Sequence, residues 1–222
     1  TDGYGASNVP EASTNCRPLE RMFRMNREPD DARLVALLRA FEQRPAAAVP
    51  RRAQDREAAV ALVLRPREEL EVLLIKRAER ADDPWSGHMA LPGGRRAPDD
   101  PDLLATAKRE TEEETHLPLE RVGTFIGRLD DVAPGNRRLP PIVIAPFVLG
   151  VPPSTTARPD GREVDATLWV PLSALREPGA VSELLIELGN GESRRFPSLL
   201  YQDHVIWGLT HGILTTFLRV AE

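Results

Sequence analysis

Three glutamates, Glu110, Glu113 and Glu114, constrain this chain most, because they fall at helical spacing within one short segment. Residues 102–115 are rich in Ala, Leu, Lys and Glu, which predicts a helix that stops at Pro118. Positions i, i+3 and i+4 share one face of a helix, so the three carboxylates would repel one another. A hard divalent cation would offset that repulsion, since Mg²⁺ and Mn²⁺ prefer oxygen ligands. The alternative is a solvated acidic surface, which a bare acidic run would favour.

A glycine turn and an arginine accompany the acidic run. Leu91-Pro92-Gly93-Gly94 lies upstream of the predicted helix, and Arg109 directly precedes Glu110. Glycines let the backbone approach a site closely and present carbonyl or amide groups to it. This coupling of a turn, an arginine and three acids favours a metal site over a solvated surface.

These residues resemble the box of the Nudix family, G-x5-E-x7-R-E-U-x-E-E-x-G-U, where U is a bulky apolar residue. The matching positions are Gly94, Arg109-Glu110, Glu113-Glu114 and Leu117. The interval from Gly94 to Arg109 is one residue longer than in the box, and the first acid is Asp100, or Asp99, rather than Glu. Thr111 stands at an apolar position and His116 replaces the last glycine. We therefore expect His116 to take the left-handed conformation that ends the helix.

The resemblance implies a fold and a chemistry. The fold is an α/β/α sandwich with a mixed β-sheet, and the reaction is hydrolysis of a nucleoside diphosphate derivative with Mg²⁺ or Mn²⁺. By the same resemblance, Glu113 and Glu114 are metal ligands, and Glu110 is a ligand or the base that activates water. Arg109 would orient the helix by pairing with Glu113 or with the Asp100 region. The carbonyl of Gly93 or Gly94 would contact the metal.

A second resemblance concerns the coenzyme A pyrophosphatase branch, in which LLTxR[SA] and G-x3-FPGG precede the box. The similar segments here are Leu73–Ala78, Gly87–Gly94 and, near the end, Ile206–Thr210. The branch motif also has an arginine between the first two of these segments, and the corresponding position in this sequence lies near Asp82 or Asp83. This resemblance implies coenzyme A or an acyl derivative, cleaved to a phosphopantetheine product and adenosine 3′,5′-bisphosphate. ADP-ribose, NADH and dinucleoside polyphosphates are the alternative substrates, and a non-catalytic nucleotide sensor is the alternative function.

Four residues are predicted to contact the substrate: Arg77, Trp85, Gly93 and Arg95. Arg77 matches the branch motif, and arginines bind phosphates bidentately. Trp85 would either stack on a nucleobase or anchor a lid. We interpret His88 as structural and Glu163 as a solvated loop charge.

Composition excludes several functions. Lys and Arg number 29 against 34 Asp and Glu, a net charge of −5 that argues against a nucleic-acid partner. The single cysteine, Cys16, excludes an internal disulfide and a four-thiolate zinc site. The apolar runs are too short to span a bilayer, and the first residues lack a signal-peptide pattern. We expect a cytoplasmic enzyme that binds a small nucleotide and touches no membrane, and a homodimer is a candidate assembly.

The chain divides into three predicted parts: a flexible arm at 1–28, a helix and linker at 29–56, and the Nudix domain at 57–222. The helix is expected at 32–43, where apolar residues recur at helical spacing. Further predicted elements are strands at 58–64, 70–77, 122–129, 142–149 and 167–170, a hairpin over 182–196 around Asn190-Gly191, and a terminal helix at 204–220.

Overall fold

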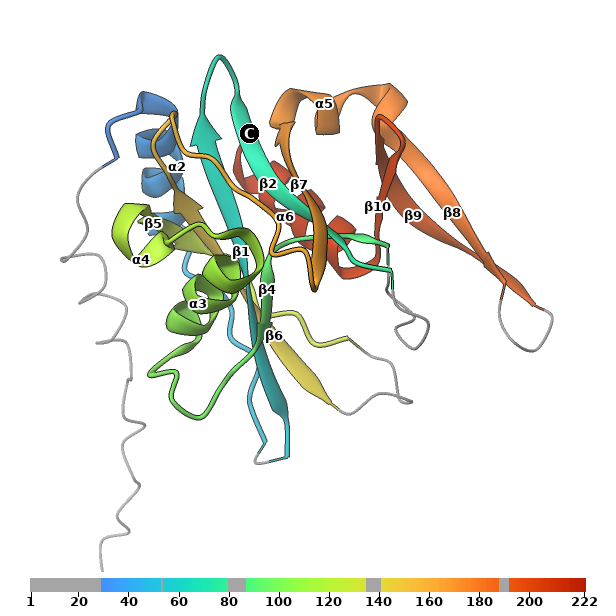
Figure 1. Ribbon diagram of the computed structural model, residues 1–222, viewed down its shortest axis with the longest axis horizontal. Coiled ribbons are helices and arrows are strands. Elements are labelled where there is room, and N and C mark those ends of the chain that lie inside the picture. The colour runs from blue at the N-terminus through green and yellow to red at the C-terminus, as the bar shows by residue number, and fades with distance from the viewer. Residues whose placement is uncertain (1–28, 53, 80–86, 135–140, 188–191) are drawn as a thin grey trace, which may run out of the picture.

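The computed structural model describes residues 29–222 except 53, 80–86, 135–140 and 188–191. The predicted arm at 1–28, Trp85 and the Asn190-Gly191 turn therefore lie outside the described residues. A seven-stranded sheet forms the centre of the molecule (Figure 1). Its strands are β1 (Arg56–Pro66), β2 (Leu70–Arg77), β3 (Met89–Ala90), β4 (Gly93–Arg95), β5 (Thr124–Arg128), β6 (Ile142–Gly150) and β7 (Val164–Pro171).

The sheet is mixed, as expected. The strand order is β3-β2-β1-β6-β5, with β4 also paired to β1 and β7 to β2. Strands β1 and β6 run parallel from the Arg56–Ile142 pair to the Leu64–Gly150 pair, and the other neighbours are antiparallel. This arrangement brings the short glycine strand β4 against the centre of the sheet.

Helices cover both faces of the sheet. On one side lie α2 (Ala32–Glu42) and α6 (Gly208–Val220), and on the other lie α3 (Leu103–Thr115) and α4 (Leu119–Val122) (Figure 1). Successive residues of β1 alternate between the two cores, with Leu62 and Leu64 facing α2 and α6, and Ala61 and Val63 facing α3. Burial on both faces explains why this strand reads as a continuous apolar run.

The N-terminal helix α2 packs directly on the sheet. Asp31 caps it by accepting a hydrogen bond of 2.9 Å from the Arg33 amide, and Leu34, Leu37 and Phe41 are buried. The Phe41 ring fills the space above Gly127, where an added Cβ would lie 2.3 Å from Phe41 Cγ. The predicted helix is thus present, and it shares the core of the domain.

A second, three-stranded sheet extends from the body of the molecule (Figure 1). It follows α5 (Leu172–Arg176) and the 3-10 turn η1 (Pro178–Ala180), and consists of β8 (Val181–Glu187), β9 (Ser193–Tyr201) and β10 (His204–Trp207). The prediction of one helix over 204–220 is wrong at its start, because Ile206 and Trp207 pair with Leu199 and Ser198 of β9. The helix begins at Gly208, whose φ of 64° makes the turn from strand to helix. No helix in the described chain combines the length and apolar character needed to cross a membrane.

A short helix also replaces part of a predicted strand. The strand expected at 122–129 begins only at Thr124, because α4 occupies Leu119–Val122. The remaining predicted strands are present, with ends that differ by a few residues.

Candidate functional site

The acidic helix α3 has well-defined ends. Asp102 caps its start by accepting a hydrogen bond of 2.8 Å from the Ala105 amide. At its other end His116 has φ 53° and donates its amide to the Glu112 carbonyl at 2.9 Å. The expectation of a left-handed residue at His116 is confirmed, so the chain closes the helix without the usual glycine.

The three glutamates of α3 differ in exposure. Glu114 is 5% exposed, the side chain of Glu110 is 19% exposed and that of Glu113 is 58% exposed. The helix face therefore turns two carboxylates toward the sheet and leaves the third near solvent.

The two glycines of β4 receive the two buried carboxylates. The Gly93 amide donates to Glu114 Oε2 at 2.9 Å. A Cβ added at Gly94 would lie 2.4 Å from Glu110 Cδ and 2.5 Å from each of its carboxylate oxygens. Gly93 itself has φ 151°, and a Cβ there would meet the Ala59 carbonyl at 2.3 Å. Glycine is thus required at both positions, since a side chain at either would push into the carboxylates or the sheet.

Arg109 joins three acids. Its Nε and one Nη donate to the two Asp100 oxygens at 2.9 Å each, and the other Nη donates to Glu113 Oε2 at 3.0 Å. An ion pair of 3.0 Å connects it to Glu110. Both pairings considered from the sequence, with Glu113 and with Asp100, are present together. The hydrogen bonds from Arg109 hold the pKa of Asp100 well below its ordinary value, so this pair is charged on both sides.

Nearby positive charge compensates the two buried carboxylates only in part. Burial, the largest effect, raises the pKa of Glu114 to about 8, and the charge of Glu110 adds to the rise. The Gly93 amide and the charge of Arg77 oppose this rise without cancelling it. Burial also raises the pKa of Glu110, although Arg109 works against it. A cation placed between these groups would reverse both effects.

Glu163, interpreted from the sequence as a solvated charge, belongs to the same electrostatic environment. Its charge raises the pKa of both Glu110 and Glu114, although its own side chain is exposed. The loop is held by Asp160, whose carboxylate accepts hydrogen bonds from the amides of Glu163 at 3.0 Å and Val164 at 2.9 Å. Only the position of Glu163 just before β7 pointed to it in the sequence, because its approach to α3 depends on long-range packing.

The same loop is attached to both neighbours of the site. The Asp160 amide donates to the Glu114 carbonyl at 3.1 Å, and the Ala78 amide donates to the Glu163 carbonyl at 2.8 Å. The loop is therefore fixed between the end of α3 and the end of β2, where Arg77 lies.

Three of the four residues predicted to contact the substrate belong to the described part of the chain. Arg77 ends β2, its amide donates to the His88 carbonyl at 3.0 Å, and its charge acts on Glu114. Arg95 ends β4 with an exposed side chain, while its carbonyl accepts a 3.1 Å hydrogen bond from Arg109. The structure thus brings Arg77, Gly93 and Arg95 to the edge of the acidic site.

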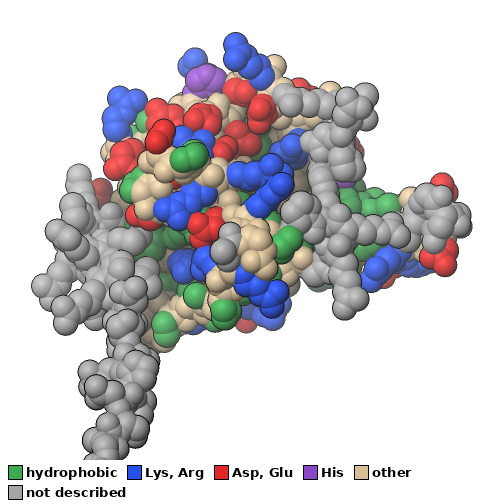
Figure 2. Space-filling view, turned by 90° about the horizontal axis from the view of Figure 1, so that it is seen from below, with side chains coloured by type: hydrophobic (Ala, Val, Ile, Leu, Met, Phe, Trp, Pro, Cys, Tyr) green, Lys and Arg blue, Asp and Glu red, His purple; other side chains and the backbone are tan. Residues whose placement is uncertain are grey.

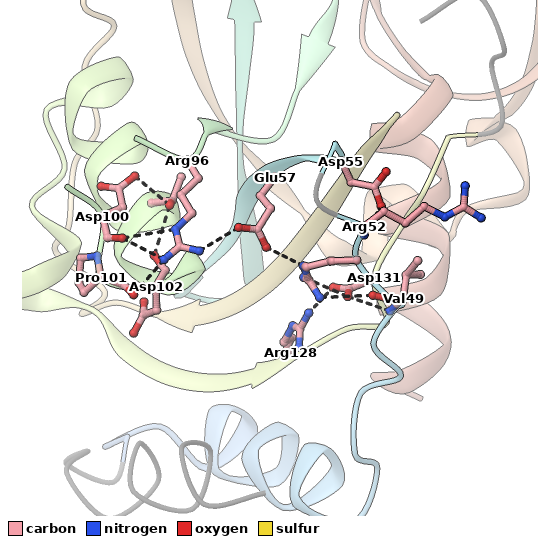
Figure 3. A network of polar contacts seen from close by, with 12 residues as sticks. Val49, Arg52, Asp55, Glu57, Arg96, Asp100, Pro101, Asp102, Arg128 and Asp131 are labelled. Atoms are coloured by element: carbon pink, nitrogen blue, oxygen red, sulfur yellow. Dashed lines mark hydrogen bonds and ion pairs between the residues drawn. The ribbon is translucent and has the colours of Figure 1, made fainter. Parts of the chain in front are cut away.

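Arg96, which follows Arg95 in the sequence, is held by hydrogen bonds within the protein itself (Figure 3). It donates to Glu57 at 2.8 Å and to the carbonyls of Asp100 and Pro101. Glu57 in turn pairs with Arg51 at 2.6 Å. This network ties the segment before β1 to the loop that presents Asp100 to Arg109.

The donor set suits a hard cation, although no three His, Cys, Asp or Glu side chains among the described residues already converge closely enough to hold one. Glu110 and Glu114 are buried oxygen donors whose pKa values stay raised in spite of Arg109 and Arg77, and Glu113 lies on the same helix but faces Arg109. On the described part of the face in Figure 2, Lys and Arg alternate with Asp and Glu and form no continuous basic stripe.

Known proteins resemble this chain in sequence and in fold. A family model described as NUDIX domain matches residues 54–186, which include β4, α3 and Glu163. The uncharacterised Nudix hydrolase NudL of Photorhabdus laumondii is 32% identical over 167 residues, 74% of this chain and 86% of that protein. An uncharacterised protein of Schizosaccharomyces pombe is 34% identical over 132 residues, which are 58% of this chain and 40% of that protein, so the match spans less than half of its length. A crystal structure of a MutT/nudix family protein from Enterococcus faecalis has a TM-score of 0.53 at 19% identity, covers 84% of this chain and 69% of that one, and supports the fold alone.

Proposed function

Because the chain belongs to the Nudix hydrolase family, which acts on pyrophosphate bonds, we propose that Glu110, Glu113 and Glu114 hold its divalent metal, and that coenzyme A or an acyl-coenzyme A is its substrate. One observation carries the metal assignment. The carboxylates of Glu110 and Glu114 pack against the two glycines of β4, where burial raises the pKa of both. Carboxylates in such a place are stabilised by a bound cation.

We assign the following roles to the metal and to the residues of the site. Bound Mg²⁺ or Mn²⁺ makes water more acidic and offsets charge on the phosphate oxygens. Glu114, held by the Gly93 amide, serves as the most fixed ligand. Glu110 or Glu113 takes the proton from the attacking water, and the raised pKa of Glu110 suits this role. To serve as a ligand, Glu113 would have to give up its hydrogen bond with Arg109, while the two bonds to Asp100 would keep Arg109 and the helix in place. Glu163 is a further candidate for the base, since its charge already acts on Glu110 and Glu114.

The substrate assignment rests on the branch motif. Its two segments form β2 and the stretch from Gly87 to Gly94, which includes β3 and the start of β4. Arg77 would bind the diphosphate, and its electrostatic contact with Glu114 supports that role. Arg95 would supply a second positive charge in place of the arginine missing from the motif. A cytoplasmic location stays a prediction from the sequence.

The substrate is tested by a panel assayed with Mg²⁺ and with Mn²⁺. Coenzyme A, acetyl-coenzyme A, ADP-ribose, NADH and diadenosine polyphosphates are incubated with the protein, and the products are identified by mass. Preferred cleavage of coenzyme A to phosphopantetheine and adenosine 3′,5′-bisphosphate supports the proposal. Preference for another nucleotide would discard the branch assignment and keep the metal site. Tight binding without cleavage of any compound would indicate a nucleotide sensor.

The metal site is tested separately by Glu113→Gln. This substitution should abolish turnover and leave the fold intact, because the side chain is exposed and lies on the helix surface. Glu112→Gln is the matched control, as Glu112 is an exposed glutamate of the same helix turned away from the site. Full activity in Glu113→Gln would contradict its assignment as a ligand.

A further inference from the structure

Exposed apolar side chains gather on the small sheet. In the described chain, the large hydrophobic residues that stay exposed are Val181 (73%) and Leu185 (58%) on one face of β8, Leu200 of β9 on the other face of that sheet, and Leu209 at the start of α6. Single exposed apolar residues are ordinary, but two on one face of the seven-residue strand β8 suit an interaction surface.

The outer edge of β8 is open. The strand order of this sheet is β10-β9-β8, and β8 pairs along all seven of its residues with β9 alone among the described strands. Figure 1 shows β8 at the margin of the sheet that faces away from the body of the molecule. The strand has no proline, no lysine and no register shift, three of the usual devices that protect an edge from pairing, but it does carry Glu183 and Glu187, whose charges restrict how a second strand can pair. By contrast, the edge strand β5 of the large sheet packs against α2.

We propose that β8 pairs antiparallel with β8 of a second copy, about a two-fold axis that passes through Leu184. The two three-stranded sheets then join into one continuous sheet. The contact is isologous, which is the commonest way in which two identical chains associate.

The charges of β8 select this register. Residues directly opposite each other in an antiparallel pair share a face, so the axis must pass through a residue and not between two. With the axis at Leu184, Glu183 lies opposite the partner's Leu185, and Glu187 lies opposite the partner's Val181. An axis at Glu183 places that glutamate opposite itself, and an axis at Leu185 places Glu183 opposite the partner's Glu187. Like charges directly opposite each other destabilise a strand pair. Of the three registers, with the axis at residue 183, 184 or 185, only the one at Leu184 avoids placing two glutamates opposite each other.

The interface is small and separate from the acidic site. Pairing of one seven-residue strand with its copy buries less than the standard interface of about 1,600 Å², so a Kd in the micromolar range is expected. The proposal does not depend on the substrate or on the metal, because none of the site residues lies on β8.

Two substitutions of equal shape test the contact. Leu185→Glu places a carboxylate opposite the partner's Glu183 twice, once on each side of the axis, whereas Leu185→Gln makes the same change of shape without charge. Within one chain residue 185 lies opposite Arg195, which pairs with Glu183 at 3.0 Å, so a glutamate at 185 lies next to positive charge in its own hairpin. Thermal unfolding of both variants checks that the hairpin stays folded. Sedimentation equilibrium should show a dimer of the glutamate variant weaker than that of the glutamine variant by about tenfold or more at low salt. The gap should narrow at high salt, since ions screen exposed charges.

Cysteine cross-linking tests the register in a Cys16→Ser background. Oxidation of Leu184→Cys should give a covalent dimer, because residue 184 meets its own copy at the axis and a disulfide requires close Cα atoms. Ser182→Cys lies on the same face two residues away and should not cross-link. The proposal is overturned if the wild-type chain stays monomeric at about 100 µM, well above the micromolar Kd expected for an interface of this size. It is also overturned if the two Leu185 variants dimerise equally, or if the cysteine at 182 cross-links in preference to the one at 184.

Discussion

Removal of the charge of Glu114 should stabilise the metal-free protein at neutral and alkaline pH. Burial raises the pKa of this carboxyl from its ordinary 4.5 to about 8. Below pH 4.5 the group is protonated in both the folded and the unfolded chain and has no effect. As the pH rises, the unfolded chain loses the proton while the folded chain keeps it, so the free energy of unfolding falls. Above pH 8 the loss is complete, and it corresponds to roughly 5 kcal/mol at 1.36 kcal/mol per pH unit.

Glu114→Gln removes this titration and keeps the acceptor for the Gly93 amide. Urea unfolding is measured for both proteins in the presence of a chelator. The variant should match the wild type near pH 4.5, exceed it by about 3 kcal/mol at about pH 7, and exceed it by up to about 5 kcal/mol at about pH 9. Glu112→Gln, which removes an exposed charge of the same helix, should show no such dependence on pH.

Two results would refute the reasoning. If Glu114→Gln and the wild type lose stability in parallel from acid to alkaline pH, Glu114 ionises without penalty in the folded chain. If saturating Mg²⁺ stabilises both proteins equally, Glu114 is not a ligand, because a ligand that binds only the intact site stabilises only the wild type by mass action.

Two further predictions concern the surroundings of the acidic face, and a third concerns α6 on the other side of the sheet. Gly94→Ala should lower kcat by about tenfold or more, because the new Cβ would displace Glu110, and misplaced catalytic groups are costly. Gly212→Ala, in open space on α6, should leave kcat unchanged and raise stability by about 0.5–1 kcal/mol in thermal unfolding. Asp100→Asn should cost roughly 1–3 kcal/mol in urea unfolding at neutral pH through the lost pair with Arg109. Since Arg109 lowers the pKa of Asp100, the stabilisation exists above the ordinary pKa of Asp, and the deficit of this variant should shrink as the pH falls.

Local signals in the sequence were sufficient to predict much of the fold. The strands β1 and β2 are apolar runs separated by a polar turn, and α3 has a capping Asp102 and strong helix formers. The motif around Gly94 and Arg109 then led to the α/β sandwich with a mixed sheet, which the structure and its comparisons confirm. Spacing alone also placed three glutamates on one side of α3.

Properties that depend on packing between distant segments were not predictable. Val205 and Ile206 fit a helical pattern as well as a strand, and only pairing with β9 decides between them. Likewise, the adjacent arginines Arg95 and Arg96 cannot be distinguished as phosphate ligands from the sequence alone. The structure separates them, because Glu57 and two backbone carbonyls already engage Arg96. The different burial of Glu110, Glu113 and Glu114 also depends on the approach of β4 to the helix.

Glu114 lowers the stability of the metal-free protein, and it is the residue to which the proposed function assigns the role of a metal ligand. Arg109 offsets part of the negative charge, but its two hydrogen bonds to Asp100 hold it away from Glu114. Arg77 acts on Glu114 only through its charge. Glutamine at 114 would relieve the remaining imbalance without metal, yet it would remove a charged ligand. The same substitution should therefore yield a protein that is more stable without metal and inactive with it. Such a trade of stability for function is expected where a buried carboxylate is kept for its charge and not for its packing.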